Sequence, residues 1–397
     1  MPETAGQVRP LHGIKVVEFT HMVMGPTAGL ILADLGADVI KVEPPTGDNT
    51  RRLQGSGGGY FAMYNRNKSS LCLDLKSSEG LALAQDIVSH SDIMVENFRP
   101  GAMDKLGLGY EALKSHNPGL IYCSLKGFLS GPYEHRTALD EVAQMMGGLA
   151  YMTGLPDKPM RAGSSVIDIT GGMFGVIGIL SALQERHRTG IGRHVTSSLF
   201  ETTAFMVGQH IAQQGVLGDE PPPMSVRRSA WSVYDIFTCR EGSRIFVGVV
   251  SDSLWQRFCE EFGFDEWATD ESLATNNERV QRRATIIPTI QALFDTLGMD
   301  ELTTRLDRAG LPFAPINKPI DLVDDPHMQA GGLLDIELSN GESIRLPALP
   351  VEFDGEKTRV YRQLPKPGQG GLEYLQRLGI DSGRVEALLT AGIIAPE

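Results

Sequence analysis

The first 43 residues of the chain constrain its fold most strongly, because two apolar runs flank one helical segment there. Residues 14–19 (IKVVEF) and 38–43 (DVIKVE) are typical of buried strands, and residues 25–37 (GPTAGLILADLGA) are typical of a helix with a proline in its first turn. Two strands joined through a helix lie parallel, with a right-handed crossover. The chain is therefore predicted to begin with an α/β unit.

The same alternation of helix and strand continues to about residue 127. A predicted helix at 78–90 precedes the strand 92–97, and a helix near 109–115 precedes the strand 120–127. This order predicts a doubly wound domain built on a parallel sheet. The segments that follow are predicted as helices at 138–150 and 169–188, the stretch RHVTSSLF at 193–200, and a helix to about 215.

A proline-rich segment, GDEPPPM (218–224), predicts a linker after this large domain. Beyond it, SVYDIFTC and SRIFVGVV are typical of an antiparallel pair of strands, followed by helices at 252–262, 277–297 and 299–309. We expect a large α/β domain over 1–215 and a smaller α+β domain over 225–320. A last segment, 325–397, returns to strand and ends in two short helices.

Composition excludes several classes of protein. The net charge of −13 argues against a nucleic-acid binder and against an anionic membrane surface as partner. The four cysteines are far apart and form no CxxC pair, which predicts reduced thiols without a disulfide framework or zinc site. Residues 1–13 lack the apolar core of a signal peptide, and the run GGMFGVIGILSAL is too short to span a bilayer. A cytoplasmic location is expected.

Cofactor motifs are also missing. The first strand–helix turn, THMVMGP (20–26), lacks the dinucleotide glycines, and GSGGGY (55–60) lacks the Lys-Ser/Thr of a phosphate loop. We interpret 55–60 as a mobile surface or lid loop. The nine histidines show no metal-binding spacing, and no G-x-S-x-G motif occurs. No metal or redox cofactor is expected.

The segment VENFRPG (95–101) follows a predicted strand at the carboxyl edge of the sheet, where α/β proteins bind ligands. Asn97 is suited to bond an amide, Phe98 to stack on a ring, and Arg99 to hold a phosphate. An ordinary strand-to-helix turn is the alternative. Three lysines add positive charge in this region: Lys76, Lys105 and Lys126.

Two carboxylate positions allow either a structural or a chemical role. Asp140 opens a predicted helix together with Glu141, where the helix dipole stabilises acids. Asp168 stands alone in RAGSSVIDITGGMFGVIG (161–178), ahead of a glycine pair. Its local sequence favours a helix cap that accepts N–H groups of Thr170 or Gly171, with a reacting carboxylate as the alternative.

A series of ordered motifs changes this balance. They include PLHGIKVVEF, LGADVIKVEPPTGDNTR, VENFRPGAMDKLGLGYEAL, IYCSLKGFLSGPY, ALDEVAQMMGGL, DITGGMFGVIGILSAL and GLPFAPINKPIDLVDDP. Together they closely resemble the class III CoA-transferase family, also called the CaiB/BaiF type. The resemblance covers residues from about 10 to 393.

The resemblance implies a two-domain subunit whose C-terminal segment returns to the large domain, and an interlocked homodimer. It implies an enzyme that moves CoA from an acyl-CoA, such as succinyl-CoA, to a small carboxylic acid. Asp168 matches the family's nucleophile, which reacts through mixed anhydrides and an aspartyl-CoA thioester. CoA is then a substrate, and no cofactor is held permanently.

The family's CoA contacts transfer to one set of positions in this chain, namely Val23, Met24, Leu73, Asp74, Leu75, Lys76, Asn97, Phe98, Arg99, Lys105, Thr137, Ala138, Leu139 and Asp140. At the nucleophile, we expect the helix N-terminus to keep Asp168 ionised near neutral pH. We expect N–H groups of the following Ile-Thr-Gly-Gly turn, or neighbouring ones, to stabilise developing negative charge. The glycines there let ligand and backbone approach closely.

Departures from the family pattern limit which acyl groups and which phosphate contacts are expected for this chain. Formyl-CoA transferase has Gln at the position of Val23 and Arg at that of Pro44, and its small domain has a glycine run that is missing here. Formyl or oxalyl specificity is therefore not expected. Since Pro44 cannot bind a phosphate as an arginine does, Arg51 or another base is expected to bind it instead.

Three further hypotheses stay open. A racemase of the family needs a histidine before the aspartate that matches Asp140, whereas this chain has Leu139, which carries no proton. Acyl-CoA epimerisation is thus the weaker alternative, beside a non-catalytic CoA-binding protein. Arg227 and Arg228 are candidates for the distal carboxylate of a dicarboxylate, although exposed arginine pairs are usually solvated.

Overall fold

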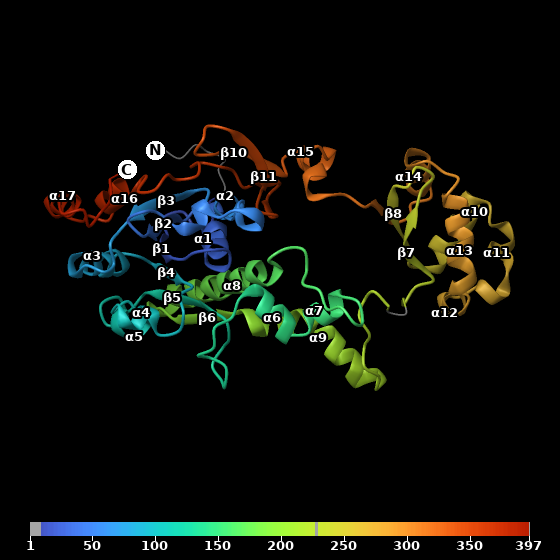
Figure 1. Ribbon diagram of the computed structural model, residues 1–397, viewed down its shortest axis with the longest axis horizontal. Helices are drawn as coiled ribbons and strands as arrows, with labels where there is room; N and C mark the ends of the chain where they lie inside the picture. The colour runs from blue at the N-terminus through green and yellow to red at the C-terminus, as the bar shows by residue number, and fades with distance from the viewer. Residues whose placement is uncertain (1–8, 227–228, 397) are drawn as a thin grey trace. The chain divides into compact units, whose positions relative to one another are not determined.

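The computed structural model describes residues 9–226 and 229–396. The chain divides into two compact units, one up to Val226 together with the segment from Pro326 onward, and the other ending at Asp325. The C-terminal segment thus belongs to the same unit as the N-terminal half (Figure 1).

The first unit is built on a six-stranded parallel sheet of order β3-β2-β1-β4-β5-β6. Its strands are β1 (Lys15–Phe19), β2 (Asp38–Glu43), β3 (Lys68–Cys72), β4 (Ile93–Glu96), β5 (Ile121–Lys126) and β6 (His194–Ser198). The α/β prediction is confirmed. Because β1 pairs with both β2 and β4, the strand order reverses there, and the loops after β1 and β4 lie side by side at the carboxyl edge.

One face of the sheet is covered by α1 (Met24–Asp34) and the long α8 (Val166–Thr189). The two helices approach closely because α8 has glycines at the contact. A Cβ on Gly171 would lie 2.6 Å from Met24 Cε, and one on Gly172 would lie 2.7 Å from the Met24 carbonyl oxygen. These glycines therefore serve helix packing, where the sequence suggested close approach of a ligand.

Helix α8 starts three residues earlier than the predicted 169–188. Its 24 residues are long and apolar enough to cross a membrane by length and composition alone, and it is the one such helix within 9–226 and 229–396. Residues such as Val176, Ile179 and Leu183 are buried in the core with the sheet and α1. Other apolar residues of α8, Met173 and Ile177 among them, are exposed.

The opposite face of the sheet is covered by α3 (Ser78–Ser89) and by the C-terminal α16 (Gly371–Arg377) and α17 (Ser382–Thr390). Figure 1 shows α16 beside β3, where Gly370 bridges to Ser70. The remaining elements of this unit are α2 (Tyr60–Tyr64), α4 (Ala102–Lys105), α5 (Tyr110–Leu113), α6 (Asp140–Met146), α7 (Leu149–Thr153), α9 (Leu199–Leu217), α15 (Pro326–Gln329), β10 (Leu333–Glu337), β11 (Ser343–Pro347), β12 (Glu352–Phe353) and β13 (Glu356–Lys357).

The second unit has an antiparallel sheet of order β7-β8-β9, with strands β7 (Val233–Thr238), β8 (Arg244–Val249) and β9 (Phe313–Pro315). The predicted antiparallel pair is confirmed and gains a third strand. Its helices are α10 (Asp252–Phe262), α11 (Asp265–Thr269), α12 (Asn276–Gln281), α13 (Arg283–Phe294) and α14 (Met299–Arg308). The prediction of one helix over 277–297 is wrong, because the helix is interrupted at Arg282, between α12 and α13.

Candidate active site

A cavity of about 570 Å³ opens at the carboxyl edge of the parallel sheet, where the loops after β1, β4 and β5 meet the first turns of α6 and α8. It brings together the nucleophile candidate Asp168 and nine of the predicted CoA contacts. These nine are Val23, Met24, Asn97, Phe98, Arg99, Thr137, Ala138, Leu139 and Asp140. Segments far apart in the sequence thus converge on one site.

Asp168 is the third residue of α8, which begins after Ser165. The expected capping role of its carboxylate is wrong, because Asp140 caps this helix instead. Asp140 Oδ2 accepts hydrogen bonds from the backbone N–H of Ile167 (2.9 Å) and of Asp168 (3.1 Å). No hydrogen bond to the Asp168 carboxylate occurs within the described ranges, so its oxygens face the cavity free to react.

The side chain of Asp140 is buried and held on both oxygens. Gln144 Nε2 donates to Oδ1 at 2.5 Å, and Arg161 Nη2 lies 3.5 Å from the same oxygen. Gln144 Oε1 also accepts from Ala162 N at 2.8 Å, which ties the segment before α8 to α6. Asp140 therefore lines the cavity mainly as a positioning residue for the first turn of α8.

Burial raises the pKa of Asp168 to about 7, and the negative charge of Asp140 adds to this rise, while Arg161 opposes it. The pKa of Asp168 thus shifts in the direction opposite to the one expected from the helix N-terminus. The N–H groups of Ile167 and Asp168 in the first turn of α8 already donate to the Asp140 side chain, so they are not available to the Asp168 carboxylate.

The turn after β4 is fixed to the loop after β1 through Asn97. Its Nδ2 donates to the His21 carbonyl oxygen (2.9 Å), and its Oδ1 accepts from His21 N (3.0 Å). The Phe98 and His21 rings are 5.3 Å apart, and Phe98 is 37% exposed. Arg99 is exposed and makes no ion pair within the described part of the chain, which leaves its guanidinium free for an anionic ligand.

A model of CoA-transferase family III matches residues 11–370. The chain belongs to this family. A succinate–glutarate CoA-transferase of Agrobacterium fabrum is 33% identical over 392 residues, which cover 95% of this chain and 98% of that protein. A formyl-CoA:oxalate CoA-transferase of Streptomyces coelicolor is 31% identical over 423 residues, covering 97% and 99%.

The fold of this family III CoA-transferase is also found in solved structures. The crystal structure of a CaiB/BaiF family protein from Brucella suis superposes with a TM-score of 0.82 at 34% identity. The match covers 94% of this chain and 100% of that chain. The family relatives are CoA-transferases over nearly their whole length, so this chain is a CoA-transferase as well.

The other predicted CoA contacts of this CoA-transferase do not line the cavity. Leu73 is 1% exposed and packs in the core beside the C-terminal segment. Leu75 packs on the same core, and Asp74 accepts a hydrogen bond from Lys76 N at 2.9 Å. The side chains of Lys76 and Lys105 are exposed outside the cavity wall. The side chain of Leu73 thus cannot reach a ligand, and the assignments of the other four stay predictions.

Two bases that the sequence analysis named, Arg51 and Lys126, already have protein partners. Arg51 binds Glu43 through Nε and Nη2 (2.8 and 2.5 Å), donates to the Pro365 carbonyl oxygen (2.7 Å) and stacks on Phe61. These contacts favour the other alternative of the prediction, in which a base other than Arg51 binds the phosphate in place of an arginine at position 44. Lys126 is likewise held by Glu96, at 2.6 Å.

The expected oxyanion donors after Asp168 are also engaged. Ile169 N donates to the Ser165 carbonyl oxygen at 3.0 Å, and the residues that follow lie inside α8, where N–H groups bond within the helix. The first turn of α1 differs, because the N–H groups of Met24 and Gly25 have no partner within their helix. Met24 lines the cavity, so the first turn of α1 is the better candidate for oxyanion donors.

Several cavity residues were missed by the sequence analysis. Tyr60, the last residue of the segment 55–60, begins α2 and lines the cavity. Arg161, seven residues before Asp168, was visible as the nearest base but was given no role. Others in the wall are His21, Arg136, Glu141 and Ser165. The proposed carboxylate-binding residues Arg227 and Arg228 lie outside the described residues.

Proposed function

We propose that the protein transfers CoA from an acyl-CoA to a free carboxylic acid with Asp168 as the nucleophile. The observation that carries this proposal is the division of labour between two aspartates. Asp140 accepts hydrogen bonds from two backbone N–H groups in the first turn of α8. The Asp168 carboxylate lines the cavity and has no hydrogen-bond partner among the described residues. A carboxylate positioned in this way gains reactivity from proximity to a bound thioester.

The reaction proceeds in four balanced steps. The Asp168 carboxylate attacks the thioester carbonyl carbon, and CoA leaves as the thiolate, which gives a mixed anhydride. The thiolate attacks the Asp168 carbonyl of this anhydride, which releases the donor carboxylate and forms an aspartyl-CoA thioester. The acceptor carboxylate attacks that thioester and again expels the thiolate. The thiolate then attacks the acceptor acyl carbon, which forms the new acyl-CoA and restores Asp168.

The surrounding residues support this course. The N–H groups of Met24 and Gly25 in the first turn of α1, which are without helical partners, are proposed to stabilise negative charge on the attacked carbonyl oxygen. Arg99 offers a free cation for a phosphate of CoA. We propose succinyl-CoA as donor and a small carboxylic acid as acceptor, because the relative from Agrobacterium fabrum is a succinate–glutarate CoA-transferase.

Mass spectrometry tests the covalent step directly. Protein mixed with succinyl-CoA without acceptor is digested rapidly at low pH, and a CoA adduct is expected on the peptide that contains Asp168. Asp168→Ala is the control and carries no adduct. An active enzyme that never carries CoA on this peptide contradicts the mechanism.

The epimerase alternative is disfavoured at one position. Leu139 lies at the cavity and is 64% exposed, but its side chain cannot exchange a proton with an α-carbon. A racemase would need a second base there, and Asp140 does not supply it because both of its oxygens are engaged. Deuterium uptake at the α-carbon without an acceptor acid would favour epimerisation.

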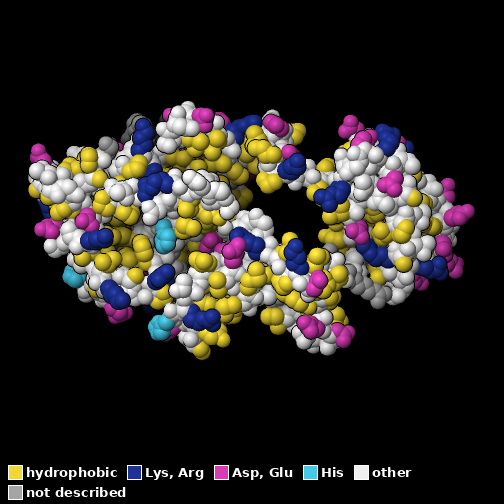
Figure 2. All heavy atoms as spheres, viewed as in Figure 1, with side chains coloured by type: hydrophobic (Ala, Val, Ile, Leu, Met, Phe, Trp, Pro, Cys, Tyr) yellow, Lys and Arg dark blue, Asp and Glu magenta, His cyan; other side chains and the backbone are white. Residues whose placement is uncertain are grey.

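We also propose that two copies of the chain associate through the apolar surface of α8 and α9. The proposed location of the protein is the cytoplasm. Met173 and Ile177 of α8 are 45% and 56% exposed, and Phe205 and Val216 of α9 are 72% and 82% exposed. Figure 2 shows hydrophobic side chains exposed over α9. Exposed apolar side chains gathered in this way mark interaction surfaces. Light scattering on the purified chain is expected to give twice the mass of one chain, and a monomer contradicts this proposal.

A further inference from the structure

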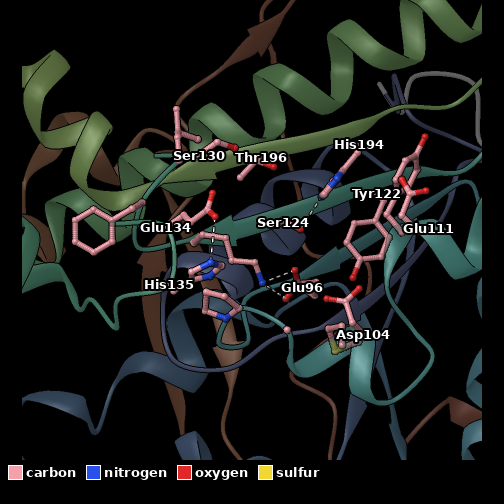
Figure 3. A pocket seen from close by; sticks show the side chains of 17 residues that line it. Glu96, Asp104, Glu111, Tyr122, Ser124, Ser130, Glu134, His135, His194 and Thr196 are labelled. Carbon is pink, nitrogen blue, oxygen red and sulfur yellow. Dashed lines mark hydrogen bonds and ion pairs between the residues drawn. The ribbon is translucent and has the colours of Figure 1, made fainter. Parts of the chain in front are cut away.

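A buried ion pair joins the ends of β4 and β5 beside the candidate active site. Lys126 Nζ lies 2.6 Å from Glu96 Oε1 and donates to Glu96 Oε2 at 2.8 Å. Both side chains are largely buried, with 2% of Glu96 and 15% of Lys126 exposed. Figure 3 shows Glu96 in a second pocket, of about 330 Å³, with Tyr122 and Ser124 of β5.

The pair binds both backbone polar groups of Phe98, its N–H and its carbonyl oxygen. Phe98 N donates to Glu96 Oε2 at 3.0 Å, and Lys126 Nζ donates to the Phe98 carbonyl oxygen at 2.8 Å. The hydrogen bonds of the Lys126 ammonium group therefore go to Glu96 and to Phe98. Lys126 lines both pockets, but Glu96 neutralises its charge. Lys126 is therefore a weak candidate for direct anion binding.

Such a pair needs an explanation other than stability, because removing two charges from water offsets much of their attraction. What it does specify is one conformation of the turn. Asn97 is fixed to His21 on one side, and the Phe98 peptide is fixed on the other. The parts left free are the half-exposed Phe98 ring and the Arg99 side chain, and both line the cavity that contains Asp168.

We propose that Glu96 and Lys126 form a clamp that presents Phe98 and Arg99 to the nucleotide end of CoA. This inference rests on the proposed function, which makes CoA the ligand of the cavity. A turn that is already ordered before binding spares the ligand the cost of ordering it. The clamp acts on CoA affinity, and the two residues are positioning residues without contact to the reacting atoms.

The test uses Glu96→Gln, with Glu111→Gln as its matched control. Glu111 lines the same second pocket but pairs with Lys114 at the surface. Calorimetry with free CoA is expected to show at least about tenfold weaker binding for Glu96→Gln and an unchanged Kd for Glu111→Gln. The KM for succinyl-CoA rises in parallel, while kcat stays within about twofold, since only a step before chemistry is affected.

A double-mutant cycle with Arg99→Ala separates positioning from general damage. If the clamp presents Arg99, Arg99→Ala weakens CoA binding much less in the Glu96→Gln background than in the wild type. Independent, multiplicative effects of the two changes overturn the clamp, as does equal CoA affinity of wild type and Glu96→Gln.

A second variant guards against misfolding. Lys126→Met keeps the Glu96 acceptor for Phe98 N but removes the bond to the Phe98 carbonyl oxygen, and it is expected to weaken CoA in the same direction. Circular dichroism verifies that both variants fold. The adduct at Asp168 reports separately on the proposed function. Its absence in the wild type overturns that function, whereas a normal adduct with unchanged CoA affinity in both variants overturns the clamp alone.

Discussion

Replacing Asp168 by Asn is expected to abolish CoA transfer and, at the same time, to stabilise the fold above pH 7. An amide cannot form the anhydride, so kcat falls by a factor of about 10³ or more. The variant keeps the size of the side chain and removes its titratable group. A rate that stays within about tenfold of the wild type contradicts the assignment of Asp168 as the nucleophile.

The stability gain follows from the direction of the pKa shift. Since the pKa of Asp168 rises from 3.8 to about 7 on folding, the folded state binds more protons than the unfolded state between these values. The wild type therefore loses stability as the pH rises from about 4 through 7. At pH 8, Asp168→Asn is expected to be about 1–3 kcal/mol more stable, and below pH 4 this difference vanishes.

A control with the same charge change isolates the effect of the site. Asp157 is exposed on the loop before α8, and Asp157→Asn is expected to leave both kcat and the pH dependence of urea unfolding unchanged. Gain of stability at pH 8 in Asp157→Asn as well would assign the effect to net charge instead of to burial at Asp168.

The fold was predictable wherever buried strands are apolar. The strands and helices up to residue 127 follow the expected alternation, because β1, β2, β4 and β5 bury mainly apolar side chains. Strand β3 lacks this signal, since its first three residues, Lys68, Ser69 and Ser70, are polar and fully buried. Lys68 is paired with Glu18, and Ser70 donates to Glu43, so tertiary contacts replace hydrophobicity there.

The site was predictable in its residues but less so in their roles. Asp168, the turn 97–99 and the segment 137–140 were all brought to one cavity as the motifs indicated. That Asp140 caps α8 depends on a contact across 28 residues of sequence, which no local spacing reveals. Arg51 likewise binds Glu43, eight residues away, and the Pro365 carbonyl oxygen, 314 residues away. The sequence around Arg51 does not reveal these partners.

The pH dependence of the reaction is expected to report on the pair of aspartates. Because Asp168 reacts as an anion, kcat/KM should rise with pH and level off above its pKa of about 7. His21, in the same cavity wall, has its pKa lowered by burial, which moves its titration away from that of Asp168, so the rise is assigned to Asp168. A rate that is flat from pH 5 to 9 contradicts a raised pKa at the nucleophile.

Asp140→Asn is expected to move this rise to lower pH and to lower the plateau. The variant removes the negative charge that is the second cause of the raised pKa, so the midpoint falls by about one unit, while burial keeps it above the ordinary value. An amide oxygen in the place of Oδ2 still accepts from the first turn of α8, but an amide nitrogen in the place of Oδ1 cannot accept from Gln144. The nucleophile is then held less firmly, and the plateau rate falls about tenfold.

Glu141→Gln provides the comparison, because it neutralises the next acid along α6, which is exposed and bonded to Arg161 at 2.9 Å. Its charge is not among the causes of the Asp168 shift, so the midpoint should not move to lower pH. If Glu141→Gln lowers the midpoint as much as Asp140→Asn does, the shift arises from the general negative charge of the cavity. If only Asp140→Asn lowers it, the residue that caps α8 also sets the pH at which Asp168 becomes a nucleophile.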